Sequence, residues 1–386
     1  MMTEIALDGN TLTSAEVLRI ASGGATVTLS SNALPKVQAA RSVVERILSN
    51  DETVYGINTG FGALVHERIS PEDLSQLQTN LIRSHATAIG ELMSKESVRA
   101  MMAVRINSLA KGNSGVHPEV LNQLIHFLNF DIVPAIPRLG SLGASGDLAP
   151  LSHMAVCLIG EGEVLCEDGG VEPTSNQLTK HGLIPLELRA KDGLSLINGT
   201  SQMCSFLVLA EQKIADLLVY ADLILCTSIE ARKASVKPSD ARVHDARPHP
   251  GQKLVSQRIR QILHDSPIID SHSNCDQVQD AYSFRCAPQV HGAINERLVA
   301  LQSTLSIELN SATDNPLVFP DLSNPGSHEV VSQGNFHGEV LALTADSMVS
   351  ALFELGSISE RRIDQMLDPA RSGLPAFLAK DSGLES

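Results

Sequence analysis

The most informative stretch of the chain is Gly140-Ser141-Leu142-Gly143-Ala144-Ser145-Gly146-Asp147. One interpretation is a helix entry, in which Ser145 or Asp147 caps a helix that begins directly after the stretch. A second interpretation is chemical. Because Gly146 has no Cβ, its backbone nitrogen can fold back onto the carbonyl carbon of Ala144. Ring closure would release one water, and loss of the Ser145 hydroxyl would release a second. The product would be an imidazolone with an exocyclic methylene, an electrophile that no ordinary side chain supplies.

Helical patterns dominate on both sides of this stretch. Upstream, the apolar residues Val37, Ala40, Val44 and Ile47 recur at spacings of three and four, which predicts an amphipathic helix. Downstream, long uninterrupted helical patterns are found over residues 200–230, 292–309 and 336–363. Strand-like alternation is confined to short pieces, such as residues 25–29.

These patterns predict a mainly α fold of two domains. A mixed, loop-rich N-terminal domain over residues 1–200 would carry the 140–147 stretch. A long-helix bundle domain over residues 201–386 would follow, and its long apolar helices would stay partly exposed in a monomer.

Composition excludes several classes of protein. The chain has 386 residues, and its 29 Lys and Arg against 44 Asp and Glu give 29 − 44 = −15. With only 3% aromatic residues, it lacks the basic surface and the stacking rings of a nucleic-acid binder. Anionic membrane surfaces are disfavoured for the same reason, and the longest apolar stretches are too short to span a bilayer. The N-terminus does not resemble a signal peptide, and six cysteines without a CxxC motif fit a reducing compartment, so we expect a cytoplasmic protein.

Other kinds of site find little support. The glycine-rich residues 55–62 lack the spacing and the following Lys-Ser/Thr of a nucleotide-binding loop. No HExxH motif is present, and His244 and His249 have no third ligand nearby in the sequence, so we expect no metal. The Gly-x-Ser-x-Gly turn of serine hydrolases is absent as well.

Six motifs, in register along almost the whole chain, resemble those of the aromatic amino-acid ammonia-lyase family. They are residues 55–62, 81–85, 140–153, 196–200, 278–289 and 335–339. Members of this family carry a methylidene-imidazolone (MIO) prosthetic group formed autocatalytically from their own chain. The resemblance implies that Ala144, Ser145 and Gly146 form this group here, without a metal or a nucleotide.

The resemblance also assigns catalytic roles. Tyr55 matches the base that removes the β-proton of the substrate, which requires a phenol pKa lowered from about 10, by loop amides and a nearby cation. Asn198 matches the asparagine that hydrogen-bonds the electrophile and the substrate. Tyr282 resembles a further residue of the catalytic pocket. The alternative for Tyr55 is a tyrosine that merely packs at a turn.

Substrate binding would fall to a second set of residues. Arg285 matches the arginine that holds the substrate carboxylate, a task for which the guanidinium fork is suited; the alternative is a solvated helix arginine. Gln279 and Phe336 resemble pocket residues. The pair Ser84-His85 resembles the form in histidine-selective members, and His85 with Gln279 can hydrogen-bond an imidazole. The alternative for His85 is a polar residue at an exposed helix end.

The resemblance therefore implies elimination of ammonia from L-histidine to give trans-urocanate, the first step of histidine degradation. It also implies a homotetramer with shared active sites. Family members continue beyond position 386 into a helical region with an active-site glutamate and a loop that closes the pocket. Two alternatives remain open: a tyrosine or phenylalanine ammonia-lyase or aminomutase of the same family, and a truncated, non-catalytic helical oligomer.

Overall fold

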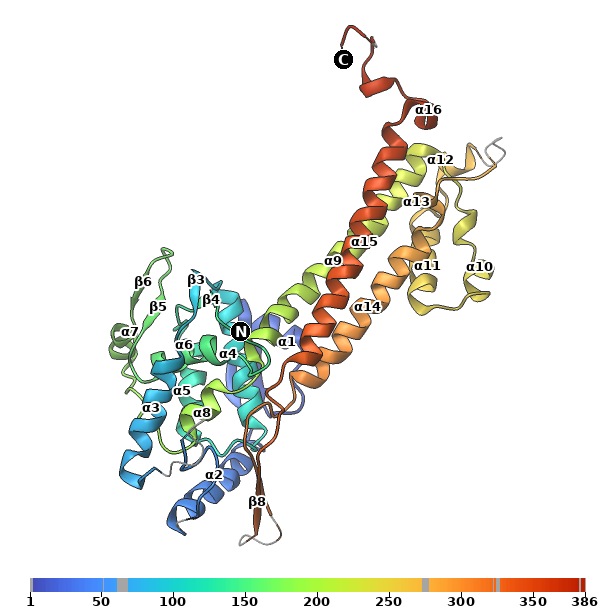
Figure 1. Cartoon of the computed structure of the whole chain (residues 1–386). Helices are drawn as coiled ribbons and strands as arrows, with labels where there is room; N and C mark the ends of the chain where they lie inside the picture. The colour runs from blue at the N-terminus through green and yellow to red at the C-terminus, as the bar shows by residue number, and fades with distance from the viewer. Residues whose placement is uncertain are drawn as a thin grey trace. The chain divides into compact units, whose positions relative to one another are not determined.

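The computed structural model describes residues 3–50, 52–60, 69–272, 278–321, 323, 327–381 and 383–385. The chain forms two compact units, coloured along the sequence in Figure 1. Unit 1 contains residues 1–209 and 304–342, and unit 2 contains residues 210–303 and 343–386. The predicted boundary at residue 200 is close to residue 209, where the chain first passes from unit 1 to unit 2. Residues 304–342, however, return to unit 1. They do so because their β-hairpin packs on unit 1, where the Val318 amide donates to the Asn113 carbonyl at 2.7 Å.

In its described residues, unit 1 is built from helices and four small two-stranded sheets. Its strands are β1 (Thr3–Leu7), β2 (Ala25–Leu29), β3 (Ile89–Leu92), β4 (Pro137–Leu139), β5 (Glu163–Leu165), β6 (Val171–Pro173), β7 (Leu317–Pro320) and β8 (His328–Val331). The pair β1–β2 is parallel, and the pairs β3–β4, β5–β6 and β7–β8 are antiparallel. Its helices are α1 (Ser14–Ala21), α2 (Leu34–Ser49), α3 (Leu74–His85), α4 (Lys95–Ala110), α5 (Pro118–Asn129), α6 (Leu148–Leu158), α7 (Thr174–His181) and α8 (Asp192–Ile197).

Helix α4 is the centre of unit 1. Fourteen of its sixteen residues, from Ser97 to Ala110, are buried, so it has almost no solvent face. Such a helix belongs in a core. Helices α1, α2 and α5 pack against α4, whereas α3, α6 and α8 pack against one another in pairs. The ends of these three helices carry most of the residues predicted for the active site in this unit.

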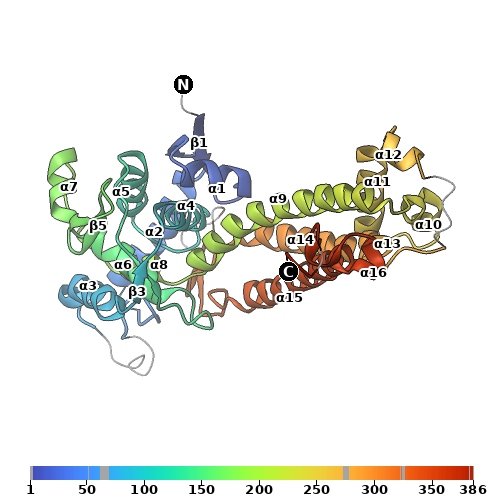
Figure 2. The ribbon, with the colours of Figure 1, turned by 90° about the horizontal axis from the view of Figure 1, so that it is seen from above.

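Unit 2 is dominated by three long helices: α9 (Ser201–Arg232), α14 (Ala287–Glu308) and α15 (Glu339–Leu367). Their portions in unit 2 lie side by side in both ribbon views (Figures 1 and 2). Shorter helices complete the unit: α10 (Ala241–Asp245), α11 (Pro250–Ile262), α12 (Pro267–Asp270), α13 (Tyr282–Arg285) and α16 (Pro369–Ser372). The buried core here includes Leu225, Val255 and Ile259, together with Phe284 from α13.

The prediction of a mainly α fold is confirmed, and the three long helical patterns correspond to α9, α14 and α15. The apolar stripe of residues 37–47 lies within α2, where Val37, Ala40, Val44 and Ile47 are all buried. The alternating residues 25–29 form β2.

Within the part of the chain that the structure describes, α15 alone is long and apolar enough to cross a membrane by length and composition. Only 22% of its most apolar window is buried. The helix also carries seven acidic or basic residues along its 29 positions, and one of them, Arg362, is 2% exposed inside unit 2. We therefore interpret α15 as a helix of the bundle with an uncovered apolar face.

Candidate active site

The Ala144-Ser145-Gly146 segment forms a tight turn at the start of α6. The Gly146 amide donates to the Gly143 carbonyl at 3.1 Å, and Gly146 has a φ of +78°. A Cβ at position 146 would lie 2.7 Å from the Gly199 carbonyl oxygen, so both the dihedral angle and the space require glycine. Ser145 is half-buried, and Ala144 is exposed.

Asp147 connects this turn to the beginning of α9. Its backbone stands at the N-cap position of α6, but its side chain makes no capping bond to that helix. The carboxylate instead accepts from the Ser141 hydroxyl at 2.6 Å and from the backbone amides of Gln202 and Met203 at 2.7 and 3.1 Å. Those two amides are first-turn donors without helical partners. Burial raises the pKa of Asp147 to about 6, opposed by these hydrogen bonds.

Helix α8 brings Asn198 to the same turn. Asn198 follows the last residue of α8, and its Nδ2 donates to the Ser145 carbonyl at 3.4 Å. The helix is held at its start by Lys191, whose Nζ donates to Asp314 at 2.5 Å and to the Ser195 hydroxyl at 3.1 Å. Both partners of this ion pair are almost fully buried. Asn198 is therefore positioned by a helix whose first turn is tied down inside unit 1.

Tyr55 lies in a turn that packs on the same elements. A Cβ at Gly56 would lie 2.7 Å from Pro316 Cδ and 2.9 Å from a methyl of Leu194 in α8. Gly56 also has a φ of +74°. Burial raises the pKa of the Tyr55 phenol, which is the direction opposite to the one we expected from the sequence. The physical reason is that burial disfavours the charged form. Phe61 and Gly62, the end of this motif, lie outside the described residues.

Ser84 and His85 are the last two residues of α3. The Nδ1 atom of His85 lies 2.9 Å from the Leu81 carbonyl, which only accepts, so Nδ1 carries the hydrogen and Nε2 is left as an acceptor. Ser84 is exposed, and its hydroxyl donates to the same carbonyl at 3.0 Å. A Cβ at Gly140 would lie 2.7 Å from the Cβ of Ala88. Ala88, three residues after the end of α3, therefore contacts the first residue of the 140–147 stretch directly.

Phe336 belongs to a backbone segment that closes over the same turn. The Gly338 amide donates to the Gly143 carbonyl at 3.0 Å, and a Cβ at Gly146 would lie 3.2 Å from the Phe336 carbonyl oxygen. A Cβ at Gly338 would collide with the Met203 side chain at 2.3 Å. The Phe336 ring itself is half-buried.

Gln279, Tyr282 and Arg285 gather in unit 2. The Arg285 guanidinium carbon lies 4.3 Å from the centre of the Tyr282 ring, a cation–π contact. With the Gln279 amide turned to satisfy both groups, its oxygen accepts from the two terminal nitrogens of Arg285 at 3.1 and 3.3 Å. Tyr282 is 70% exposed. The three residues thus form one cluster, with the guanidinium oriented from two sides.

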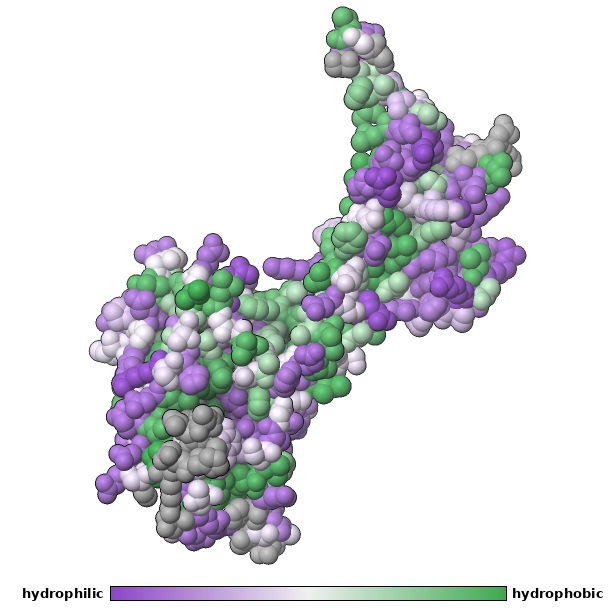
Figure 3. Space-filling model, viewed as in Figure 1, coloured by the Kyte–Doolittle hydropathy of each residue, from purple (hydrophilic) through white to green (hydrophobic). Residues whose placement is uncertain are grey.

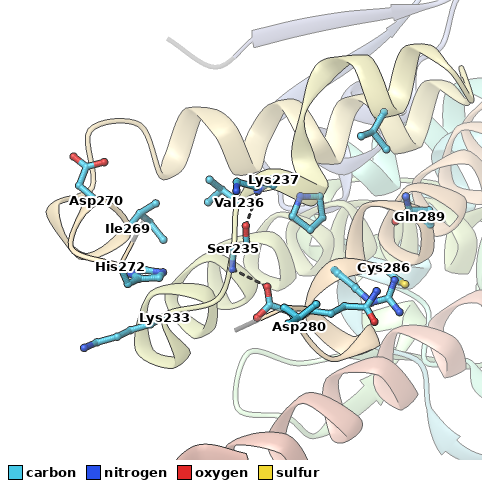
Figure 4. A pocket seen from close by; sticks show the side chains of 15 residues that line it. Lys233, Ser235, Val236, Lys237, Ile269, Asp270, His272, Asp280, Cys286 and Gln289 are labelled. Atoms are coloured by element: carbon cyan, nitrogen blue, oxygen red, sulfur yellow. Dashed lines mark hydrogen bonds between the residues drawn. The ribbon is translucent and has the colours of Figure 1, made fainter. Parts of the chain in front are cut away.

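A cavity of about 750 Å³ opens beside this cluster, and its wall includes Gln279 and Arg285. Lys233, Ser235 and Asp280 also line this cavity (Figure 4). The Ser235 amide donates to the Asp280 carboxylate at 2.7 Å, so a hydrogen bond joins two residues that line the cavity. The wall carries carboxylates, such as Asp280, as well as cations, so the cavity offers groups of both charges to a small molecule.

The structure divides the predicted site residues between the two units. Unit 1 brings together the Ala144-Ser145-Gly146 turn, Asn198 and the Phe336 backbone, with Tyr55 and the Ser84-His85 pair on the elements around them. Unit 2 brings together Gln279, Tyr282 and Arg285. Neither unit by itself contains the complete predicted set.

Two buried polar groups near the turn were not predicted. Arg105 is fully buried; its Nη2 donates to the Ser195 carbonyl, and its Nη1 and Nε have no hydrogen-bond partner among the described residues. Burial lowers its pKa to about 10. The Lys191–Asp314 pair is the second group. An arginine inside an otherwise helical core pattern was the only signal in the sequence, and it does not distinguish a buried from an exposed position.

Among the described residues, no group of three or more His, Cys, Asp or Glu side chains could hold a metal ion. His244 has protein partners on both ring nitrogens, the Pro238 carbonyl at 3.0 Å and the Gln252 amide at 2.9 Å. These contacts give His244 a structural role in unit 2.

Comparison with known proteins gives matches along nearly the whole chain. Residues 12–386 match the family model described as "Aromatic amino acid lyase". A histidine ammonia-lyase from Myxococcus xanthus is 47% identical over 382 residues, which cover 99% of this chain and 74% of that protein.

Solved structures agree. The histidine ammonia-lyase of Trypanosoma cruzi superposes with a TM-score of 0.87 at 41% identity, covering 100% of this chain and 71% of the other. The tyrosine aminomutase of Streptomyces globisporus superposes with a TM-score of 0.90 at 39% identity, covering 99% and 75%. The fold, the motifs and these matches agree: the chain belongs to the aromatic amino acid lyase family of carbon–nitrogen lyases.

Proposed function

We propose that this chain is a histidine ammonia-lyase, which eliminates ammonia from L-histidine to give trans-urocanate. The observation that carries the proposal is the cradle around Gly146, since the turn is shaped so that only glycine fits at the position the ring chemistry requires. Relatives named histidine ammonia-lyase at 41–47% identity support the choice of substrate.

The residues present fit the MIO prosthetic group. The turn at residues 144–146 already folds back on itself, and the Asn198 amide donates to the carbonyl of Ser145. When formed, the group would supply an electrophile that converts the substrate's amino group into a good leaving group. Asn198 and the backbone around Gly199 would hold it in place.

The chain's other residues would bind and orient the substrate. Arg285 would hold the carboxylate with its guanidinium fork, which Gln279 and Tyr282 keep oriented. His85 would accept a hydrogen bond from the substrate imidazole at Nε2, because its Nδ1 hydrogen is engaged by the Leu81 carbonyl. Holding the substrate at both ends would direct its β-C–H bond.

Tyr55 would remove the β-proton through its phenolate oxygen. Burial works against ionisation of this phenol, so the proposal needs a positive charge close to Tyr55 in the assembled site. The charge would come from the substrate or from another copy of the chain. We further propose, as the family resemblance implies, that the active site is shared between subunits.

A homotetramer is the assembly that we propose. Figure 3 shows hydrophobic surface along the long helices of unit 2, and on α15 the exposed residues Val349, Phe353, Ile363 and Leu367 share one face. An uncovered apolar face of this kind is typical of an interaction surface. We also propose that the protein acts in the cytoplasm, as the composition suggests.

The main rival is a tyrosine- or phenylalanine-specific enzyme of the family, which the similarity to a tyrosine aminomutase favours. Substrate preference would separate the two, since an imidazole needs the polar partners that His85 supplies whereas a phenyl ring leaves them unsatisfied.

Intact mass and turnover test the proposal together. We expect a mass lower than the sequence by two waters, ultraviolet absorbance from urocanate with L-histidine, and little product with L-tyrosine or L-phenylalanine. In Ser145→Ala the mass deficit and turnover should both disappear, while Ser152→Ala, a buried serine in α6, serves as the matched control and should keep both. Faster consumption of tyrosine would overturn the substrate, and activity unchanged in Ser145→Ala would overturn the chemistry.

A further inference from the structure

A chain of buried polar side chains lies behind α13, the four-residue helix that carries Tyr282 and Arg285. Asp222 of α9 accepts from His291 Nδ1 of α14 at 2.8 Å and from Arg258 of α11 at 3.0 Å. Arg362 of α15 lies 3.4 Å from His291 Nε2. Asp222, His291 and Arg362 are each at most 2% exposed. All of these residues belong to unit 2.

The direction of each hydrogen bond follows from the chemistry of the groups. A guanidinium only donates, so His291 Nε2 accepts from Arg362, and His291 Nδ1 carries the hydrogen that is donated to Asp222. In this arrangement the imidazole connects the guanidinium of Arg362 with the carboxylate of Asp222. Arg258 supplies the second cation to that carboxylate.

The remaining bond of Arg362 goes to α13. Its Nε donates to the Ser283 carbonyl at 3.0 Å in a buried contact. An isolated helix of four residues is not stable by itself. Its N-cap residue Ala281 offers no side-chain cap, so tertiary contacts must fix the helix. Phe284 fixes it through the core, and Arg362 fixes it through the backbone.

The two faces of α13 have different tasks. Ser283 and Phe284 are buried against the rest of unit 2, whereas Tyr282 is exposed and Arg285 is half-buried at the cavity wall. A rotation of so short a helix would change the direction of the Arg285 guanidinium, which Gln279 and Tyr282 constrain only near its tip.

We propose that Arg362, held by His291 and Asp222, is a positioning residue for the substrate's carboxylate, because its bond to the Ser283 carbonyl orients α13 and with it Arg285. The substrate part of this inference rests on the proposed function. The orientation of α13 does not.

The test compares Arg362→Met with Arg361→Met, the adjacent residue of α15, whose side chain is 61% exposed and pairs with Glu360 on the surface. We expect Arg362→Met to raise KM for L-histidine about tenfold or more, from loss of a buried charged hydrogen bond, with Arg361→Met near the wild type. Inhibition by histamine, which lacks the carboxylate, should change less than about twofold in both variants, because histamine has no group for the Arg285 fork. The mass deficit of two waters should persist.

A double-variant comparison separates positioning from general destabilisation. In an Arg285→Met background, adding Arg362→Met should raise KM no further, since the group it orients is already gone. An equal rise in both backgrounds, or equal KM values for Arg362→Met and Arg361→Met, would overturn the inference. If Arg362→Met does not fold, Arg362→Lys keeps the charge but cannot reach both partners, and the same comparisons apply with smaller effects.

Hydrogen exchange gives a readout that does not depend on turnover. The amides of Arg285 and Cys286 donate to the carbonyls of Ala281 and Tyr282. Their exchange should quicken in Arg362→Met, and that of Ile259 in α11 should not. If exchange quickens in Arg362→Met but the wild-type chain does not deaminate histidine, the proposed function is wrong and the role of Arg362 in orienting α13 is supported. If the wild-type chain is active but Arg362→Met changes neither the exchange rates nor KM, the inference about Arg362 is wrong and the proposed function stands.

Discussion

At the scale of single residues, glycine positions carry the most restrictive information about the site. Gly146 and Gly199 leave no space for a Cβ, and a Cβ at Gly338 would displace the flexible end of the Met203 side chain; these contacts come from the surroundings of the 144–146 turn. Gly199, for example, would place a Cβ 2.3 Å from Arg105 Nη1. The motif pattern predicts that glycine is needed at 146, but the reason at 199 and 338 is visible only in three dimensions.

Gly146→Ala should therefore abolish ring formation. The new methyl group would meet the Gly199 carbonyl oxygen and would also force a φ of +78° on an alanine, a strain of about 1–3 kcal/mol. We expect a chain with the full sequence mass and no turnover. Gly169→Ala is the control, because that glycine has a φ of +84° with nothing within 4 Å of the added carbon. If Gly146→Ala still lost two waters, the cradle would not be needed for the chemistry.

The phenol of Tyr55 predicts the pH dependence of turnover. A base must be deprotonated to act, and burial raises the pKa of this group, so the active form becomes more abundant as pH rises towards that pKa. We expect kcat/KM to increase from pH 7 to pH 9. A profile that is flat over this range, or that falls, would contradict the role of Tyr55. Tyr55→Phe should lose turnover and keep the mass deficit, which separates the base from ring formation.

At the scale of secondary structure elements, the buried pair Lys191–Asp314 fixes the start of α8 to the segment that precedes β7. Lys191→Met would leave the Asp314 carboxylate without its cation in a buried position, and we expect a loss of about 3–5 kcal/mol in unfolding free energy. Denaturant titration measures this loss. Lys253→Met, which breaks a pair whose side chains are 47% and 61% exposed, should cost less than about 1 kcal/mol. Similar losses in both variants would mean that the buried pair contributes no more than a surface pair.

Sequence patterns predicted the elements better than their connections. The long helices α9, α14 and α15 were predicted from their periodicity, because an apolar stripe is a local property. The return of residues 304–342 to unit 1 was not predicted, since it depends on contacts with residues about 200 positions earlier, such as Asn113. The sequence also predicted the role of Asp147 only in part. Its position before α6 suggested a cap, whereas its carboxylate binds the amides of α9.

At the scale of the whole molecule, the exposed apolar face of α15 predicts assembly through the bundle. Phe353→Asp places a charge at a position that is 72% exposed, so it should not harm the fold of a single chain but should weaken the proposed tetramer. Sedimentation velocity should show smaller species, with turnover lost if sites are shared between copies. Phe377→Asp, at a residue that is 86% exposed outside the bundle, is the control. An unchanged sedimentation coefficient for Phe353→Asp would exclude this face from the interface.

The site as a whole could be predicted from motifs only as a set of residues. Six motifs named both halves of the set, but they carried no information on which residues share a unit. That division depends on where the chain crosses between units, at residues 209 and 303 and again at 342, and such crossings leave no local signal in helices as regular as α9 and α14. The similarity to known relatives confirms the family. Only the structure shows which site residues belong to which unit.

The bond from the Gly338 amide to the Gly143 carbonyl has a consequence for the timing of maturation during synthesis. The turn at residue 146 is complete only after residue 338 has been added, 338 − 146 = 192 residues later. At about 5–20 residues per second, the ribosome needs about 10–40 s for that length of chain. A nascent chain stalled before residue 338 should therefore carry an unreacted Ala144-Ser145-Gly146, so the electrophile would arise only after the segment that contains residue 338 has been synthesised and has packed on the turn.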